Sequence, residues 1–257
     1  MCVSLNTGKL TGVYLKIMII ELTGIPGVGK TVIFGKLKEQ LKENGKFVFS
    51  VKGKILESFG LRFSDGNLIG DILFDGFLFL IFLWNRQWNS SVTRNVFKTV
   101  FEGKNSIFFK INILRNVMKK ISVNLFCENN KKFHGLTFII DEGVTHIPFN
   151  LFADSGAERD EIENILRALR LPKMVILVDD DEEEIFRRLK SRGHKRIKVN
   201  DDAQIKYFIS KNREIMTRVK FYLKGHNIDV REVANNTADF ETNMCRLTSY
   251  MKENTGE

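Results

Sequence analysis

The sequence predicts an α/β fold, a three-layer sandwich in which a mostly parallel sheet has helices on both faces and carries a helical insertion. Apolar runs recur at 17–22, 136–140 and 174–178, and such runs are typical of strands buried on both faces. Segments with helical periodicity separate these runs, and strands that alternate with helices favour a parallel sheet. A glycine-rich turn joins the first run to the first helix, as in a βαβ unit.

The composition is that of an ordinary globular chain. We expect one domain over 1–257, with an insertion at about 53–134 and a lid at about 187–200. The net charge of +9 fits a basic soluble enzyme, and nucleic acid is a less favoured partner. The apolar run 76–84 is too short to span a membrane, which takes about 20 residues. Three cysteines without a CxxC pair fit a cytoplasmic location, and a dimer is compatible with the sequence.

The first half of the chain predicts a strand, a helix and then the insertion. The helix after the glycine-rich turn has apolar residues at Ile33, Leu37 and Leu41, and Gly45 stands where a helix would end. A second strand is expected at 47–51. The insertion contains no proline, and we expect helices at 67–84, 90–101 and 107–123 that cover the edge of the sheet.

The second half continues the alternation. The strand at 136–140 ends in Asp141-Glu142-Gly143, and a helix at about 158–170 stops near Pro172. The strand at 174–178 follows, and helices are expected at 181–192 and 202–224. A short strand at 228–230 and a helix near 238–252 complete the prediction.

The glycine-rich turn predicts a phosphate-binding loop, and with it a P-loop NTPase fold. Its backbone N–H groups and the start of the following helix would surround the phosphates of ATP or GTP. Lys30 is expected to reach the β- and γ-phosphates, and the Thr31 hydroxyl to bind Mg²⁺. The nucleotide-binding segment comprises Gly24, Ile25, Pro26, Gly27, Val28, Gly29, Lys30, Thr31 and Val32.

Two carboxylates follow the third predicted strand. Asp141 lies at its carboxyl end, where open α/β sheets bind ligands, and we expect it to hold Mg²⁺. Glu142 could act as a base toward water or an acceptor hydroxyl, and the sequence does not decide which carboxylate has that role. The alternative is that Asp-Glu-Gly only ends a strand.

Six acids at 179–184 precede a basic helix. The pairs Glu183–Arg187 and Glu184–Arg188 have i,i+4 spacing, so a solvated helix with a complemented dipole is one interpretation. Arg188 and Arg192 share a face, however, and more positive charge follows Gly193. We expect these two arginines to be catalytic, in a lid that closes over polyphosphate.

The order of these motifs resembles the nucleoside and nucleotide kinase group of P-loop proteins, which includes thymidylate and adenylate kinases. Glu184, Arg188, Arg192 and Gly193 match that group's E-x-x-x-R-x-x-x-R-G helix. The resemblance covers about 17–52 and 136–253. It implies that 233–237, with Asn235 and Asn236, contacts adenine. The chain departs from thymidylate kinases in having Asp-Glu after the third strand, where they usually carry Asp-Arg.

The expected function is transfer of a phosphoryl group from ATP, with Mg²⁺, to a nucleoside, nucleotide or similar small hydroxyl compound. The acceptor is expected between the insertion and the carboxyl edge of the sheet, with Arg62, Asp65 and Arg86 as candidate contacts. One alternative is an AAA+-like ATPase, because Asp-Glu is also a Walker B ending. Others are a nucleotide-dependent interaction module and a protein that acts on nucleic acid.

Overall fold

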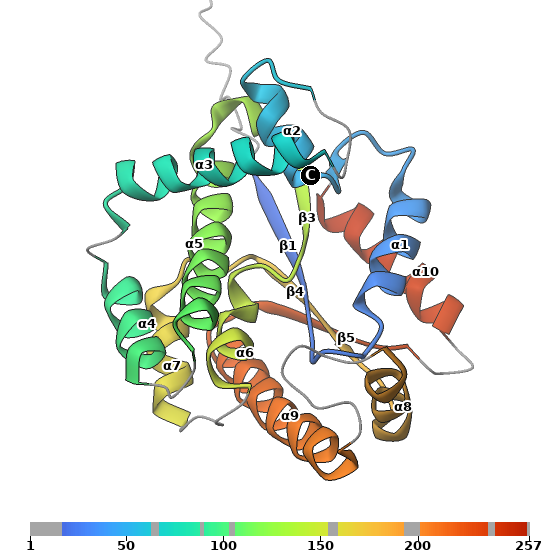
Figure 1. Cartoon of the computed structure of the whole chain (residues 1–257). Coiled ribbons are helices and arrows are strands. Elements are labelled where there is room, and N and C mark those ends of the chain that lie inside the picture. The colour runs from blue at the N-terminus through green and yellow to red at the C-terminus, as the bar shows by residue number, and fades with distance from the viewer. Residues whose placement is uncertain are drawn as a thin grey trace, which may run out of the picture.

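The computed structural model describes residues 17–62, 67–87, 90–102, 106–153, 159–192, 201–235 and 240–255. Within these residues, parallel strands form a five-stranded sheet in the order β2-β3-β1-β4-β5 (Figure 1). The strands are β1 (Met18–Thr23), β2 (Phe47–Val48), β3 (Thr137–Asp141), β4 (Met174–Asp179) and β5 (Asp229–Ala234). The predicted parallel α/β sheet is confirmed.

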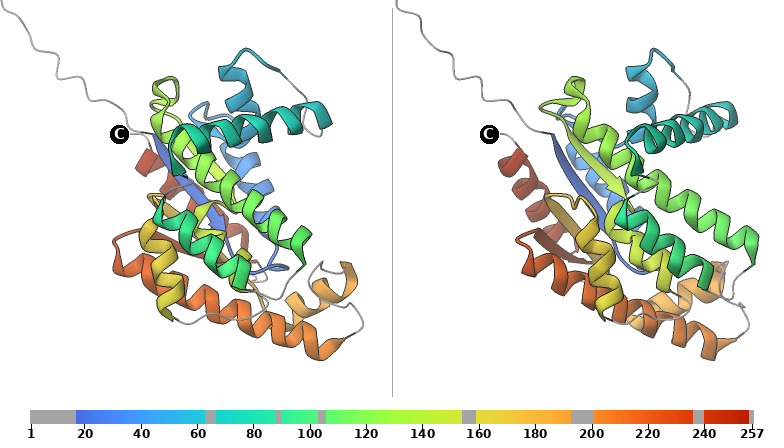
Figure 2. Two further views of the ribbon diagram at one scale, coloured as in Figure 1. Left: turned by 60° about the vertical axis from the view of Figure 1, so that its left-hand side comes forward. Right: turned by 90° about the vertical axis from the view of Figure 1, so that its left-hand side faces the viewer.

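Helices cover both faces of the sheet (Figure 2). One face carries α1 (Lys30–Leu41) and α10 (Phe240–Thr255), and the other carries α5 (Ile107–Asn129), α7 (Arg159–Ala168) and α9 (Asp202–Gly225). Alternate residues of β1 point to opposite faces. Ile20 therefore packs with Ile33 and Leu37 of α1, whereas Ile19 packs in a second cluster with Phe138.

The segment between β2 and β3 is helical, as predicted, but it lies over a face of the sheet and not along its edge. It contains α2 (Val51–Ser58), α3 (Leu68–Trp84), α4 (Ser91–Glu102), α5 and the short η2 (Lys131–Phe133). Buried residues of α2 and α3 pack in the cluster with Ile17, Ile19 and Phe138. These three residues lie where β1 and β3 begin, so α2 and α3 lie far from the carboxyl ends of the strands (Figure 1).

Two strand predictions had the wrong ends. The strand expected at 47–51 stops at Val48, because the Ser50 side chain accepts a hydrogen bond from the Gly53 N–H at 3.2 Å and starts α2. The strand expected at 228–230 continues to Ala234, because its charged residues find partners. Arg231 lies over the Tyr250 ring, and Glu232 pairs with two lysines of α9.

The remaining elements follow strands at the carboxyl end of the sheet. After β3 come η3 (Val144–His146) and α6 (Ile147–Phe152), and α8 (Glu182–Arg192) follows β4. Among the described residues, no helix is long and apolar enough to cross a membrane. The expected lid residues 193–200 and the N-terminal residues 1–16 lie outside the described part of the chain.

The contact between α1 and the sheet gives a stability prediction. Leu37 is fully buried, so Leu37→Ala should lower the free energy of unfolding by about 2–5 kcal/mol through lost contacts and a cavity. Lys38→Ala, at the next and exposed position of the same helix, should change it by less than about 0.5 kcal/mol. Urea unfolding followed by circular dichroism measures both. Equal effects would contradict the packing of α1 on the sheet.

Candidate active site

The glycine-rich turn connects β1 to α1 at the carboxyl end of the central strand. Gly27 has a φ of +95° and Gly29 a φ of +87°, so the loop adopts left-handed backbone that side chains disfavour. A Cβ at Gly29 would overlap the Asn235 side-chain amide. Within the described residues no side chain caps α1 and no acid occupies its first turn, so its N–H groups are left for an anion.

Lys30 lies over this turn, although it is the first residue of α1. Its Nζ donates to the carbonyl oxygens of Gly24 at 2.9 Å and Ile25 at 3.1 Å. The same Nζ lies 3.2 Å from Glu142 Oε1. The ammonium group is thus held between the loop backbone and the acidic turn, and only 8% of the Lys30 side chain is exposed.

The acidic turn is positioned by a buried carboxylate on β1. Glu21 is fully buried and accepts hydrogen bonds from the N–H groups of Val144 and Thr145, each at 2.9 Å, and from the Thr145 hydroxyl at 2.7 Å. A Cβ at Gly143 would overlap Glu21, so the third residue of Asp-Glu-Gly has to be glycine. Asp141 lies beside Leu22 in the parallel register, which brings it next to the glycine-rich turn.

Charges of both signs surround the two carboxylates. Burial raises the pKa of Asp141, and the negative charge of Glu142 raises it further. Burial also raises the pKa of Glu142, but the positive charges of His146, Lys30 and Lys120 outweigh this and hold it at about 2. Glu142 therefore stays ionised at neutral pH. Its backbone is left-handed, with a φ of +57°, and its carbonyl accepts a hydrogen bond from Lys120.

Two buried groups support this cluster. His146 is 4% exposed, stacks on Phe149, and lies 3.2 Å from the Thr23 hydroxyl and 3.6 Å from Glu142 Oε2. Burial lowers the pKa of Lys120 to about 8, although the neighbouring carboxylates oppose this. Among the described residues, no group of three or more histidine, cysteine or acidic side chains forms a metal site.

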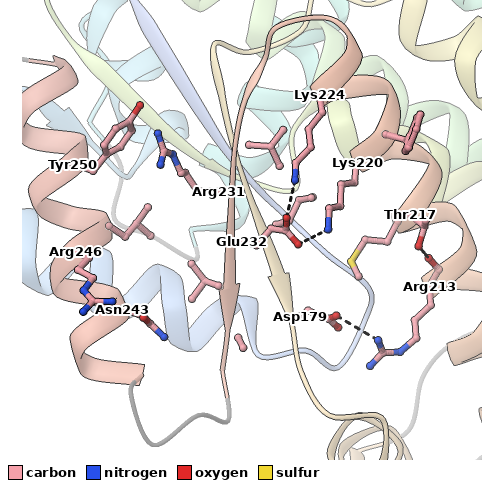
Figure 3. A pocket seen from close by; sticks show the side chains of 17 residues that line it. Asp179, Arg213, Thr217, Lys220, Lys224, Arg231, Glu232, Asn243, Arg246 and Tyr250 are labelled. Atoms are coloured by element: carbon pink, nitrogen blue, oxygen red, sulfur yellow. Dashed lines mark hydrogen bonds and ion pairs between the residues drawn. The ribbon is translucent and has the colours of Figure 1, made fainter.

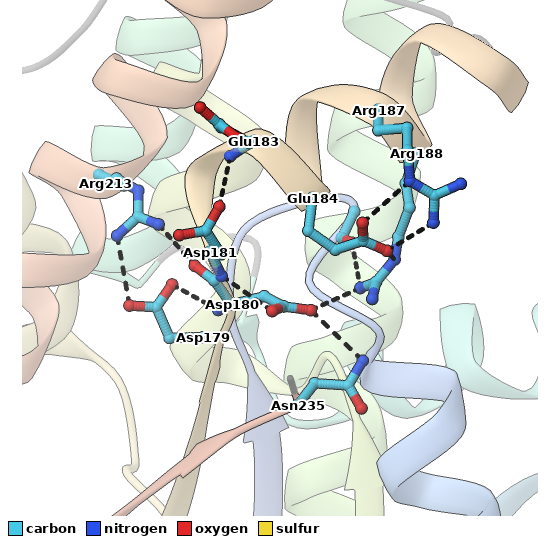
Figure 4. A network of polar contacts seen from close by, with 10 residues as sticks. Asp179, Asp180, Asp181, Glu183, Glu184, Arg187, Arg188, Arg213 and Asn235 are labelled. Carbon is cyan, nitrogen blue, oxygen red and sulfur yellow. Dashed lines mark hydrogen bonds and ion pairs between the residues drawn. The ribbon is translucent and has the colours of Figure 1, made fainter. Parts of the chain in front are cut away.

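Arg188 joins α8 to the glycine-rich turn (Figure 4). Its Nη1 lies 2.7 Å from Asp180 Oδ2 and donates to the Gly27 carbonyl at 3.1 Å, and its Nε donates to Glu184 at 2.9 Å. The Asp180 side chain is completely buried. The predicted Glu184–Arg188 pair is thus present, whereas Arg187 pairs with Glu184 and not with Glu183 as expected. Arg188 therefore links the glycine-rich turn to Asp180 through a hydrogen bond to Gly27 and a partly buried ion pair.

A cavity of about 520 Å³ opens beside these groups. Most of the predicted nucleotide-side residues line it: Pro26, Gly27, Gly29, Lys30, Thr31, Val32, Asp141, Glu142, Arg188, Arg192 and Asn235. Ile25 and Val28 are instead buried in the core, and Gly24 contributes its carbonyl to Lys30. The cavity continues to α6 and α9, where Phe149, Asn150, Phe208 and Asn212 line it.

The described residues that were expected to contact the acceptor do not line this cavity. Arg62 and Arg86 are exposed and do not line it, because they follow α2 and α3, which pack at the other end of the sheet. Asp65 and Asn236 lie outside the described residues. Sequence reasoning missed Glu21, Lys120, His146 and Asn212, each of which is a polar residue within an apolar or amphipathic stretch. A buried glutamate inside a strand is the one signal that could have found Glu21.

A larger cavity of about 1150 Å³ lies at the free edge of β5, between α9 and α10 (Figure 3). It is lined by several bases, but most already have acidic partners. Glu232 pairs with Lys220 at 2.6 Å and Lys224 at 3.0 Å, and Arg213 lies 3.3 Å from Asp179. None of the residues of the glycine-rich turn lines it. We therefore place the candidate active site at the smaller cavity.

Comparison with known proteins gives matches to solved structures but none by sequence. No family model matches the sequence, and no curated protein matches it significantly. Thymidylate kinase from Ehrlichia chaffeensis shares 13% identity at a TM-score of 0.45, over 92% of this chain and 99% of that one. Thymidylate kinase from Candida albicans shares 14% at a TM-score of 0.49, over 93% of this chain and 92% of that one.

The low pKa of Glu142 predicts a pH dependence of stability. Its folded pKa of about 2 lies below the ordinary value of 4.5, so its stabilisation is present above pH 4.5 and is lost as the pH falls toward 2. Because the side chain is 40% exposed, the loss should be only about 1–2 kcal/mol after solvent screening. Glu142→Gln should remove this part of the acid dependence, as measured by urea unfolding across that pH range.

The matched control is Glu253→Gln, at an exposed position of α10, which should keep the native dependence on pH. The same slope for the native protein and Glu142→Gln would show that the contacts of Glu142 with Lys30 and His146 add no stability.

Proposed function

We propose that this chain is a Mg²⁺-dependent kinase that transfers the γ-phosphoryl group of ATP to a small-molecule acceptor of the nucleoside or nucleotide class. One observation carries the proposal. Lys30, Asp141, Glu142 and the two α8 arginines line a single cavity that extends past the glycine-rich turn to α6. A volume of about 520 Å³ is within the roughly 300–1,000 Å³ of small-molecule sites.

The nucleotide side of the proposal rests on the turn. The uncapped start of α1 and the left-handed glycines leave a concave backbone that a Cβ would fill, which suits phosphate oxygens. Thr31 and Asp141 both line the cavity and offer the hard oxygen ligands that Mg²⁺ prefers. When bound, the ion would neutralise charge on the phosphates.

The chain's own side chains would position the phosphates and the acceptor and stabilise the charge of the transferring group. Lys30 would move from Glu142 and the loop carbonyls to phosphate oxygens, and Arg192 would approach them from α8. Once Lys30 has moved, Glu142 loses one of the positive charges that lower its pKa, so its carboxylate could accept a proton from an acceptor hydroxyl. Phosphoryl transfer depends mainly on such positioning and electrostatics.

The acceptor side has aromatic and amide character. Phe149 and Phe208 offer surfaces for a planar group. Asn212 is fully buried, its amide donates to the Phe208 carbonyl at 2.8 Å, and its Oδ1 has no hydrogen-bond partner among the described residues. A buried carbonyl without a partner is costly, so we infer that it accepts a hydrogen bond from the acceptor.

Hydrolysis is the second candidate, because Glu142 could also activate water. A screen of ADP release against nucleosides, nucleotides, sugars and short oligonucleotides separates the two functions. We expect one acceptor class to accelerate ADP release. ADP release that no acceptor accelerates would favour an ATPase, and acceleration by oligonucleotides alone would favour a protein that acts on nucleic acid.

Lys30→Ala tests the nucleotide site. It should lower kcat by about 10²- to 10³-fold or more, since it removes a charge that stabilises the transferring group. Lys38→Ala removes a lysine from the exposed side of the same helix and should keep the native rate. Circular dichroism checks that both variants fold. Turnover of ATP by Lys30→Ala at the native rate would show that the site assignment is wrong.

Asn212→Ala tests the acceptor side. Loss of one hydrogen bond should raise KM for the acceptor about 3- to 10-fold and leave KM for ATP within about twofold. Steady-state kinetics with the acceptor found in the screen measures both constants, and thermal unfolding reports any structural damage. An unchanged acceptor KM with a raised ATP KM would move Asn212 to the nucleotide side.

A further inference from the structure

Strand β5 is a free edge of the sheet. It pairs with β4 on one side, in an unbroken register from Asp229 to Ala234. On its other side, no strand of the described residues lies next to it. The edge contains neither a proline nor a bulge, two backbone features with which proteins block the addition of another strand.

The backbone of β5 presents a regular row of hydrogen-bonding groups at this edge. The N–H groups of Asp229 and Asn235, at the two ends of the β4–β5 ladder, both donate to carbonyls on the β4 side. Successive residues of a strand turn their backbone groups to alternate sides, so the odd-numbered residues face β4. Val230, Glu232 and Ala234 therefore turn their N–H and C=O groups outward. Within the described part of the chain, no group makes a hydrogen bond to them.

Helices α9 and α10 flank this edge, one over each face of the sheet (Figure 3). The cavity of about 1150 Å³ lies between them, and residues 230–234 of β5 all line it. Its volume exceeds the roughly 300–1,000 Å³ of small-molecule sites. The cavity therefore suits a longer ligand, an extended chain that lies along the strand.

The charged side chains of β5 leave the place of an added strand open. Arg231 lies over the Tyr250 ring of α10, and Glu232 pairs with two lysines of α9. Side chains of a strand stand roughly perpendicular to the sheet, and these contacts keep both side chains against the flanking helices (Figure 3). They therefore do not cover the outward row of backbone groups.

The cavity has an excess of positive charge. Its bases are Arg213, Lys220, Lys224, Arg231 and Arg246, and the acids at or beside it are Asp179, Glu232 and Asp229, the last of which pairs with Arg231. Glu232 is shared between two lysines, and Arg246 has no ion pair among the described residues. An anionic ligand is therefore favoured over a neutral or cationic one.

Three other occupants fit this edge less well. A second copy that paired through its own β5 would bring two basic cavities together. The N-terminal segment 1–16 has two lysines and no acid, so its charge is unfavourable too. A nucleic-acid backbone has the required charge, but phosphate oxygens only accept hydrogen bonds and would leave the outward carbonyls of β5 without donors.

We propose that the β5 edge binds an extended acidic peptide segment of a partner protein, which joins the sheet as a sixth strand. Its backbone pairs with the outward groups of β5, and its acidic side chains face the bases on α9 and α10. Phe221 lines the cavity and is 72% exposed, so an apolar side chain of the peptide gains contact with it. The proposal is independent of the kinase function, because no residue of the glycine-rich turn lines this cavity.

Fluorescence polarisation with the full chain tests the binding. The probe is a fluorescein-labelled peptide of about six residues, the length of β5, in which glutamate alternates with valine. It should bind in the micromolar range. The same peptide with lysine in place of glutamate should bind at least about tenfold more weakly. N-methylation of one set of alternate amides should weaken binding by a similar factor, because these amides then cannot donate to the strand.

Substitutions in the protein test the edge itself. Glu232→Pro removes an outward N–H and keeps the hydrogen bonds to β4, whereas Glu232→Ala removes the same carboxylate and keeps the N–H. The proline variant should bind the peptide at least about tenfold more weakly than the alanine variant. Arg246→Glu should weaken binding about 5- to 10-fold, and Lys252→Glu, at an exposed position of the same helix, should change it by less than about twofold. Circular dichroism checks the fold of each variant.

Several outcomes would overturn the proposal. The glutamate peptide could fail to bind, or both sets of N-methylated peptides could bind as tightly as the unmodified one, which would leave charge alone as the cause. Loss of peptide binding in Lys30→Ala would place the peptide at the smaller cavity. Binding of a single-stranded oligonucleotide without binding of the peptide would assign this edge to nucleic acid.

Discussion

The hydrogen bonds of the Glu21 carboxylate hold the turns at the carboxyl ends of β1 and β3 together. An ionised carboxylate loses its hydration when it is buried in the central strand, and burial raises the pKa of Glu21 accordingly. Two backbone N–H groups and one hydroxyl after β3 replace the lost water. Those donors belong to the segment that follows Asp141-Glu142-Gly143. The acidic turn is therefore tied to β1, the strand that ends at the glycine-rich turn, and the two motifs cannot separate without exposing that carboxylate.

Once the turn is fixed, the charges around it balance one another. Lys30 lies beside one carboxylate oxygen of Glu142 and His146 beside the other, and Lys120 donates to the Glu142 carbonyl. The positive charges keep Glu142 ionised. Asp141 has a raised pKa, so it is the weaker acid of the two carboxyl groups. A polyanion at the glycine-rich turn would compete with Glu142 for Lys30. Binding there and the freedom of Glu142 to act are thus coupled through a single ammonium group.

Sequence patterns predicted the strands and helices whose apolar residues recur at regular spacing. The sheet, most of its helices and the glycine-rich turn between β1 and α1 follow from apolar runs and from glycine spacing, and their positions agree with the structure. Contacts between segments that are distant along the chain could not be predicted from the sequence. Asp180 looks like one of six helix-capping acids, yet it is the completely buried partner of Arg188. Arg62 and Arg86 were expected near the acceptor because they lie in the insertion, but packing of α2 and α3 against Ile19 and Phe138 takes them to the other end of the sheet.

The same packing places α2 and α3 at the end of the sheet opposite the polar cavity. The polar cavity lies at the carboxyl ends of the strands, where turns leave backbone groups free for a ligand. Helix α3 lies near the beginning of β1 and β3 (Figure 1), and its Phe74 and Leu78 belong to the same apolar cluster as Ile19 and Phe138. None of the described residues of α2 or α3 lines the cavity, so its walls come from the turns that follow the strands and from α6, α8 and α9.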